Sequence, residues 1–224
     1  MSYTSLPTGN SRSVTSRQTG IHQALAARVE RYRRTSFRRP FARHSQQAFE
    51  VAQRIVEAHG LPLILDAGCG VGDSTRALAR QFPDHLVLGV DRSANRLSRQ
   101  RPNTPSNCHL IRANLIDFWR LARKAGWQLA RHYLLYPNPY PKPQHLTRRF
   151  HAHPVFQDLL ALGGIFECRS NWRIYIDELQ LALHLHGIVA QVEQLTFQPE
   201  PLTAFERKYQ ASGQTLWRLV ATIE

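Results

Sequence analysis

The hydrophobic positions along the chain form short apolar runs that alternate with segments of helical spacing. Short apolar runs are typical of strands, and apolar residues at every third or fourth position are typical of helices. The expected strands are Leu63–Ala67, Leu86–Asp91, Cys108–Arg112, 132–136, 165–169, 188–195 and Leu216–Ile223. The expected helices between them are 74–82, 93–100, a helix from residue 115, 148–162 and 172–186.

This alternation of strands and helices predicts a parallel sheet. The last two strands follow each other with no expected helix between them, so we expect antiparallel pairing at one edge. The predicted fold is α/β and Rossmann-like: a mostly parallel, seven-stranded twisted sheet with an antiparallel edge strand and helices on both faces. This domain is expected to occupy residues 61–224.

The first 60 residues precede the alternating pattern. Residues 1–20 are rich in Ser, Thr and Gly and contain Arg12 and Arg17, which predicts a disordered basic tail. Residues 21–60 form a helical, Arg-rich segment, with helices expected at 21–32 and 45–59.

A glycine-rich turn follows the first expected strand. After Asp66, glycines stand at every second position, Gly68, Gly70 and Gly72, and Ser and Thr then open a helix. The second strand ends in Asp91, and an acid at that place binds the two hydroxyls of a ribose. The spacing G-x-G-x-G differs from the dinucleotide pattern and favours a ligand with an adenosine but no pyrophosphate. S-adenosylmethionine fits this description, with Asp66 suited to its cationic end.

Polar residues also follow the third and fourth strands. The amide of Asn114 could accept a hydrogen bond from an adenine amino group while Leu115 packs on the ring. The fourth strand enters a loop in which four prolines alternate from 137 to 143, so the loop is stiff and has few backbone donors. A stiff loop that presents Asn138, Tyr140 and Lys142 can orient a substrate.

The charge of the chain is strongly positive, with 29 Lys and Arg against 16 Asp and Glu and a formal net charge of +13. Nucleic acid is therefore the first candidate partner. Basic residues gather before the sheet and after the proline-rich loop: Arg28, Arg31, Arg33, Arg34, Arg38, Arg39, Arg148 and Arg149. No apolar stretch is long enough for a membrane span, and three cysteines without metal spacing predict buried free thiols rather than a metal site.

Three motifs carry a resemblance to known families. The glycine turn with its two acids resembles the class I S-adenosylmethionine-dependent methyltransferases. The loop YPNPYPKPQHLTRR and the later segment LTAFERKYQASGQTLWRL resemble the bacterial tRNA (guanine-N7)-methyltransferases, over roughly residues 12–224. That family has a loop of the form F-P-D-P-x-x-K-x-x-H-x-K-R-R and a C-terminal T-x-F-E that reaches back to the site.

The resemblance implies transfer of a methyl group from S-adenosylmethionine to N7 of a variable-loop guanine in tRNA, in the cytoplasm. It places Asp66, Asp91 and Asn114 at the cofactor and Asn138 at the junction of cofactor and base, as the catalytic position. The substrate side implied by the resemblance and by the basic cluster comprises Lys142, Asn171, Thr203, Glu206, Arg148 and Arg149.

This chain has Asn where the family has Asp, at Asn114, Asn138 and Asn171. An amide is neutral and adds two donors, whereas N7 already carries a lone pair and needs no proton removed. The sequence Asn138-Pro139-Tyr140 is also similar to the N-P-P-Y motif of methyltransferases that act on planar amines. The alternatives are therefore a methyltransferase for another RNA base or amine, and a catalytically weak protein that binds cofactor and RNA.

Overall fold

The computed structural model describes residues 9–35, 37–99, 103–197 and 199–224, and these residues are organised around one seven-stranded sheet. The strand order is β3-β2-β1-β4-β5-β7-β6, and every pairing is parallel except those of β7 with β5 and β6. The strands are β1 Leu63–Ala67, β2 Leu86–Asp91, β3 Cys108–Arg112, β4 Arg131–Leu135, β5 Gly164–Ser170, β6 Ala190–Leu195 and β7 Leu216–Ile223.

The predicted fold class is confirmed. Every residue of β1 and β2 is buried, which explains why both read as continuous apolar runs. Antiparallel pairing does occur at one edge, but β7 lies one place inside that edge, between β5 and β6.

The expected direct connection between the last two strands is wrong, because helix α8, Ala204–Ala211, lies between them. Thr203 begins this helix by accepting a hydrogen bond from the Glu206 N–H, at 2.9 Å. The segment is short and mostly polar, so its apolar spacing is too weak to predict a helix.

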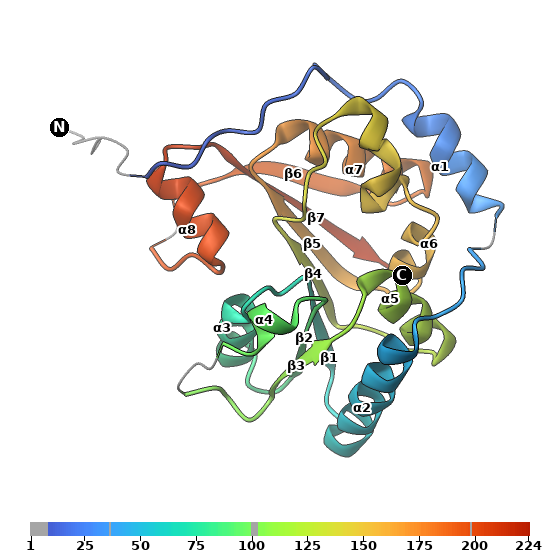
Figure 1. Ribbon diagram of the computed structural model, residues 1–224, viewed down its shortest axis with the longest axis vertical. Coiled ribbons are helices and arrows are strands. Elements are labelled where there is room, and N and C mark those ends of the chain that lie inside the picture. Colours follow the sequence, from blue (N-terminus) through green and yellow to red (C-terminus); the bar gives the residue numbers. More distant parts are fainter. Residues whose placement is uncertain (1–8, 36, 100–102, 198) are drawn as a thin grey trace.

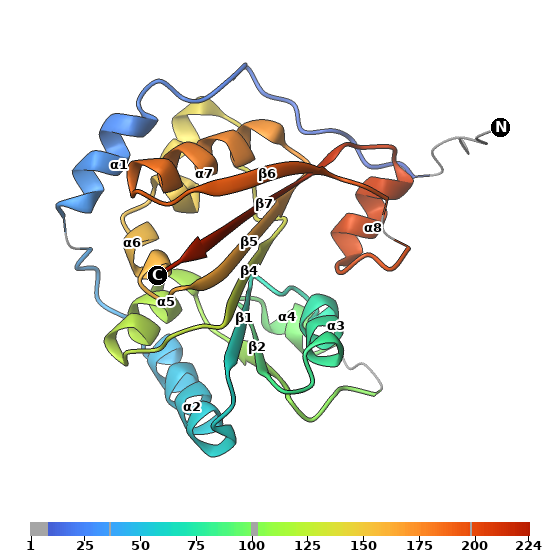
Figure 2. The same cartoon turned by 180° about the vertical axis from the view of Figure 1, so that it is seen from behind.

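Helices cover both faces of the sheet (Figures 1 and 2). At the β1–β3 half, α3 and α4 lie on one side and α2 and α5 on the other, while α1, α6 and α7 surround the β5–β6 half. Their bounds are α1 Leu25–Arg33, α2 Arg43–His59, α3 Asp73–Gln81, α4 Ala94–Leu97, α5 Leu115–Lys124, α6 Phe156–Leu160 and α7 Arg173–Leu185.

The helix expected over 148–162 is broken into three pieces. Two 3-10 helices, η1 Pro143–Arg148 and η2 Phe150–Ala152, precede α6. Pro154 explains the second break, since the residue before a proline is disfavoured in helical conformation, and His153 is extended at φ −106° and ψ 145°.

The main hydrophobic core lies between the sheet and the helices on the α5 and α7 side, and a smaller cluster lies under α3. All three cysteines, Cys69, Cys108 and Cys168, are buried and free, as predicted. Among the described residues, no helix is long and apolar enough to cross a membrane.

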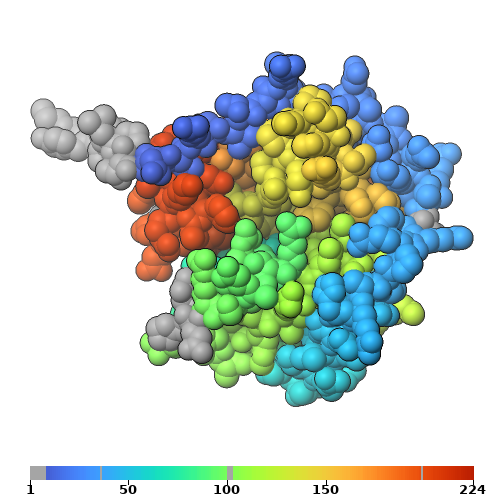
Figure 3. All heavy atoms as spheres, viewed as in Figure 1, coloured from blue at the N-terminus to red at the C-terminus, as the bar shows by residue number. Residues whose placement is uncertain are grey.

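Residues 9–20 lie against the folded domain instead of forming the expected disordered tail, and residues 1–8 fall outside the described part of the chain. The Gly9 N–H donates to the Ala211 carbonyl at 2.7 Å, and the Ser11 N–H donates to Ser212 Oγ at 2.9 Å. Figure 3 shows this dark-blue segment running along one face of the molecule, from α8 to the yellow region after β4. We call residues 9–22 the N-terminal strap.

Candidate active site at the carboxyl ends of the strands

The strand order reverses between β1 and β4, so the loops after these two strands diverge and leave room for a ligand between them. The glycine turn follows β1, and the proline-rich loop follows β4. The topology therefore brings the two sequence motifs, about 70 residues apart, to the same edge of the sheet.

Backbone geometry explains the spacing of the glycines. Gly68, Gly70 and Gly72 have φ angles of 85°, 61° and 79°, a region that other residues rarely adopt. The Gly68 N–H donates to the Val90 carbonyl at 2.8 Å, which ties the turn to β2. A Cβ at Gly70 would meet no atom within 4 Å, whereas one at Gly72 would lie 2.8 Å from the side chains of Arg76 and Leu110. Gly70 thus borders open space, and Gly72 permits close packing.

Asp91 connects the glycine turn to the loop after β2. Its Oδ2 accepts from the Gly70 N–H at 3.0 Å, and its Oδ1 accepts from the Ser93 N–H at 2.8 Å. Arg96 approaches Oδ2 at 3.6 Å. These donors orient the carboxylate, and each oxygen retains capacity for a further hydrogen bond from a ligand hydroxyl.

Asp66 is buried at the end of β1, with 1% of its surface exposed. Its Oδ2 accepts from Ser74 Oγ at 2.6 Å and Thr75 Oγ1 at 2.7 Å, while no described group hydrogen-bonds its buried Oδ1. Burial raises the pKa of Asp66 to about 6, against the two hydroxyl hydrogen bonds, which lower it. An ionisable oxygen without a protein partner is suited to a cationic or hydrogen-bonding ligand.

Asn114 caps helix α5, a role that the sequence analysis did not anticipate. Its Oδ1 accepts from the Ile116 N–H at 2.9 Å, so the oxygen expected to face an adenine amino group already has a partner. Leu115 is half-buried, and its Cδ1 lies 3.8 Å from the position that a Cβ on Gly68 would occupy. Leu115 therefore faces the glycine turn, where an adenine ring was expected.

The loop after β4 is held in an unusual backbone conformation. Tyr136 and Tyr140 have φ angles of 51° and 45°, although neither is glycine. Asn138 is exposed, and its Oδ1 accepts from the Tyr140 N–H at 3.2 Å. Its amide nitrogen is therefore the group that faces away from the loop backbone. Lys142 is exposed immediately before η1.

Glu206 is fully buried and does not face solvent. Its two carboxylate oxygens each accept from Arg169 Nη1 at 3.0 Å, and Oε2 also accepts from Tyr136 Oη at 3.1 Å. Burial and the nearby Glu206 raise the pKa of the Tyr136 hydroxyl, which therefore stays a donor. Thr203 and Glu206, expected to close over a base, begin α8, and Glu206 attaches this helix to Tyr136 after β4 and to Arg169 of β5.

Asn171 and the two arginines after the loop are placed differently from one another. Asn171 donates to Gln214 Oε1 at 2.8 Å and is half-buried. Arg148 is exposed, with its guanidinium 5.9 Å from the centre of the Tyr140 ring. Arg149 is fully buried, so the expectation that it contacts tRNA phosphates is not met, because its guanidinium is occupied inside the protein.

For two residues of this site, the sequence indicated a place at a strand end but no partner. Arg169 and Tyr136 connect α8 to the sheet, but each has the appearance of an ordinary residue at a strand end. The sequence pattern of β5 could not have named Glu206 as the partner of Arg169.

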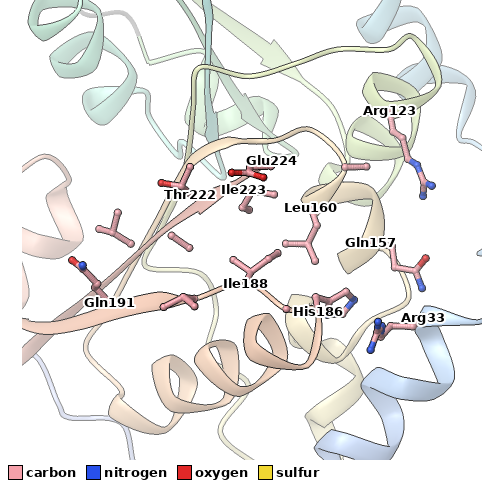
Figure 4. Close-up of a pocket in the computed structure, with 15 residues that line it drawn as sticks. Arg33, Arg123, Gln157, Leu160, His186, Ile188, Gln191, Thr222, Ile223 and Glu224 are labelled. Carbon is pink, nitrogen blue, oxygen red and sulfur yellow. The ribbon is translucent and has the colours of Figure 1, made fainter.

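A hollow of about 830 Å³ lies elsewhere in the described structure (Figure 4). It is lined by the ends of α6 and α7 and by the last residues of β7, among them Leu160, His186, Ile188 and Ile223. Ile223 is at the end of β7 that pairs with Gly164, the start of β5. The hollow therefore lies at the opposite end of the sheet from the glycine turn.

The strand order, the glycine turn after β1 and the acids at the ends of β1 and β2 define a Rossmann-like class I methyltransferase fold. Residues 61–219 match the family Methyltransf_4, described as "Putative methyltransferase". The chain belongs to this methyltransferase family.

Curated relatives include tRNA (guanine-N(7)-)-methyltransferases. The one from Leifsonia xyli subsp. xyli (strain CTCB07) is 28% identical over 170 residues, which cover 70% of this chain and 74% of the relative. The one from Treponema pallidum (strain Nichols) is 29% identical over 171 residues, which cover 70% of this chain and 66% of the relative.

Solved structures share the fold at low sequence identity. An antibiotic-related methyltransferase has a TM-score of 0.56 and 13% identity, covering 76% of this chain and 94% of that one. The 16S rRNA methyltransferase KamB has a TM-score of 0.55 and 17% identity, covering 83% of this chain and 95% of that one. At these identities the similarity establishes the fold alone.

Proposed function

We propose that this protein transfers a methyl group from S-adenosylmethionine to N7 of a guanine in tRNA, in the cytoplasm. The observation that carries the proposal is the edge of the sheet at which the glycine turn, Asp91 and the Asn138 loop meet, in a chain related over most of its length to tRNA (guanine-N(7)-)-methyltransferases.

The residues around the glycine turn fit S-adenosylmethionine. Gly70 leaves open space beside a turn with a positive φ, and Asp91 is oriented next to it with spare acceptor capacity for ribose hydroxyls. The buried Oδ1 of Asp66 has no described partner and suits the amino group or sulfonium of the cofactor. When bound, S-adenosylmethionine supplies a methyl group on a cationic sulfur.

Leu115 and Asn114 complete the adenine side of the proposed site. Leu115 faces Gly68 and can pack against the ring. Asn114 Oδ1 caps α5 with one of its lone pairs, and the amide N–H of this side chain is a donor suited to an adenine ring nitrogen.

The orientation of Asn138 is compatible with a guanine target. Asn138 Oδ1 accepts from the Tyr140 N–H, which leaves one lone pair on this oxygen. Asn138 is exposed, and the N–H donors of its amide match an acceptor such as guanine O6. N7 carries its own lone pair, so the chain needs to hold the base in position and no group has to remove a proton.

Exposed basic side chains are available for the phosphates of tRNA. Arg31, Arg34 and Arg38 are exposed around the end of α1, and Lys142 and Arg148 are exposed at the Asn138 loop. Arginine pairs with phosphate in a bidentate geometry, so these residues can position a polyanion without reading its sequence. Arg149 is excluded from this role by its burial.

Methyl transfer to tRNA distinguishes an enzyme from a protein that only binds cofactor and RNA. Purified protein is incubated with methyl-labelled S-adenosylmethionine and tRNA from a strain that lacks N7-methylguanosine, with a 16S rRNA fragment as the comparison substrate. We expect label in the tRNA and little in the rRNA. Absence of label in both RNAs, despite bound cofactor, would contradict the proposed activity.

A further inference from the structure

A buried ionic cluster lies directly behind the Asn138 loop. Arg149 Nη1 pairs with Glu178 Oε2 at 2.5 Å, and both side chains have 0% exposure. His151 Nε2 lies 3.0 Å from the same oxygen. Burial acts to raise the pKa of Glu178, but hydrogen bonds from His151 and Arg149 outweigh it and lower the pKa to about 2. The carboxylate therefore stays charged and keeps the guanidinium in place.

Two further nitrogens of the Arg149 guanidinium hydrogen-bond the loop. Nε and Nη2 donate to the Tyr140 carbonyl at 3.3 and 3.1 Å, and the guanidinium carbon lies 4.9 Å from the centre of the Trp172 ring. Tyr140 has a φ of 45°, a conformation that is costly for any residue other than glycine. Arg149 thus binds the carbonyl of a residue in this costly conformation.

The N-terminal strap completes this cluster. Gln18 Nε2 donates to Glu178 Oε1 at 2.6 Å, and Gln18 Oε1 accepts from Arg149 Nη2 at 3.0 Å. The His22 N–H donates to the same Glu178 oxygen at 3.0 Å. A buried ion pair is favourable only when its remaining donors and acceptors also form hydrogen bonds. Gln18 provides such a hydrogen bond to Glu178 and another to Arg149.

The strap also binds the loop directly. Ser16 Oγ donates to the Pro141 carbonyl at 2.5 Å, and the same Ser16 oxygen accepts from the Gln18 N–H at 2.9 Å. The alternating prolines leave the loop with few N–H groups of its own, so donors from other segments have to bind its carbonyls. Two consecutive carbonyls, those of Tyr140 and Pro141, are bound in this way, and they lie between Asn138 and Lys142.

We propose that Arg149, Ser16 and Gln18 are positioning residues that fix the Asn138 loop for the transfer reaction, so that the site is incomplete without the N-terminal strap. The catalytic consequence rests on the proposed function, whereas the support of the loop conformation does not. None of the three residues belongs to the glycine turn or its neighbours, so the cofactor site should be independent of them.

The test compares full-length variants Ser16→Ala, Gln18→Ala and Arg149→Lys with the wild-type chain. Lysine retains the charge next to Glu178 but lacks the fork that reaches Tyr140 and Gln18 at once. Ser212→Ala is the matched control, since it removes the strap contact of Ser11, which does not bind the loop carbonyls. We expect kcat for tRNA to fall about tenfold in Gln18→Ala and Arg149→Lys, with the affinity for S-adenosylmethionine unchanged, and to stay at the wild-type value in Ser212→Ala.

Hydrogen–deuterium exchange of the peptide that contains residues 136–146 gives a readout that needs no substrate. Faster exchange in this peptide, together with unchanged exchange in β1 and β2, supports the proposal. Wild-type exchange of the loop in all three variants would overturn it. An inactive wild-type protein would contradict the proposed function, and the exchange data would still decide whether these residues hold the loop.

Discussion

The Gly70 N–H donates to Asp91 Oδ2 at 3.0 Å, which joins the turn after β1 to the end of β2. This hydrogen bond therefore links the two parts of the proposed cofactor site. One is the backbone at Gly70, which leaves open space, and the other is the Asp91 carboxylate beside that space. The same contact orients Asp91 before any ligand binds, and preorganisation of this kind reduces the entropic cost of binding.

Replacement of Asp91 by Ala should weaken the binding of S-adenosylmethionine. The substitution removes the proposed partner of the ribose hydroxyls and the acceptor of the Gly70 and Ser93 N–H groups. A charged hydrogen bond contributes about 1.5–3 kcal/mol, so we expect the Kd from calorimetry to rise at least tenfold. Asp84→Ala, at the other end of β2, is the control and should bind as the wild type does. Equal Kd values for both variants would refute the ribose assignment.

Alanine at Gly70 should mainly weaken cofactor binding, whereas alanine at Gly72 should mainly destabilise the fold. A Cβ at Gly72 would lie 2.8 Å from Arg76 Nη1 and from Leu110 Cδ2, so Gly72→Ala should destabilise the fold by about 2–4 kcal/mol from backbone strain and overlap together. Gly70→Ala carries only the strain, about 1–2 kcal/mol, but places a methyl group in the proposed cofactor space. Urea unfolding and calorimetry should separate the two effects. A Gly70→Ala protein with normal cofactor affinity would contradict the site.

Asp66 should make cofactor binding depend on pH. Its pKa is raised from 3.8 to about 6 in the folded protein, and a cationic ligand prefers the ionised carboxylate. The Kd should therefore rise by up to tenfold for each pH unit below about 6 and level off above pH 7. Asp66→Asn should remove this dependence, and a wild-type Kd that is flat between pH 5 and 7 would exclude contact with the cationic end of the cofactor.

The same shift has a consequence for stability. Between pH 4 and 6 the folded protein binds more protons at Asp66 than the unfolded chain does, so the free energy of unfolding should fall as the pH rises through this window. The contribution is about 3 kcal/mol at about 1.36 kcal/mol per pKa unit. In Asp66→Asn this contribution should be absent from the pH profile of urea unfolding.

The exposed arginines near α1 should govern salt-dependent binding of tRNA. A triple variant with Ala at Arg31, Arg34 and Arg38 should bind tRNA more weakly, and the slope of log K against log salt should fall by about two to three. The control triple variant, with Ala at Arg54, Arg123 and Lys124, removes the same formal charge from α2 and α5. If both triple variants lose the same affinity for tRNA, the effect comes from net charge, and the α1 region does not contact tRNA specifically.

The sequence predicted the parts of the structure that depend on local patterns. The strands of the first half, the glycine turn and Asp91 follow from apolar runs and from residue types with narrow conformational preferences. The carboxyl ends of parallel strands share one edge, so the meeting of the glycine turn and the proline-rich loop could also be inferred.

Long-range polar pairings could not be predicted in this way. Arg149 stands in a basic run that is typical of a nucleic-acid contact, yet it is buried because Glu178 and Gln18, 29 and 131 residues away, fill its hydrogen-bonding capacity. Glu206 was expected at the substrate, but Arg169 and Tyr136 occupy its oxygens. Periodicity reports which face of an element is buried and carries no information on which distant partner meets it.

The chemical identity of the methylated atom tests the central claim most directly. After incubation with the protein and S-adenosylmethionine, tRNA that lacks the modification is digested to nucleosides and analysed by mass spectrometry against standards. We predict N7-methylguanosine, formed by the wild-type protein and strongly reduced with Asp91→Ala. A nucleoside methylated on an exocyclic amine, or no methylated nucleoside at all, would contradict the account.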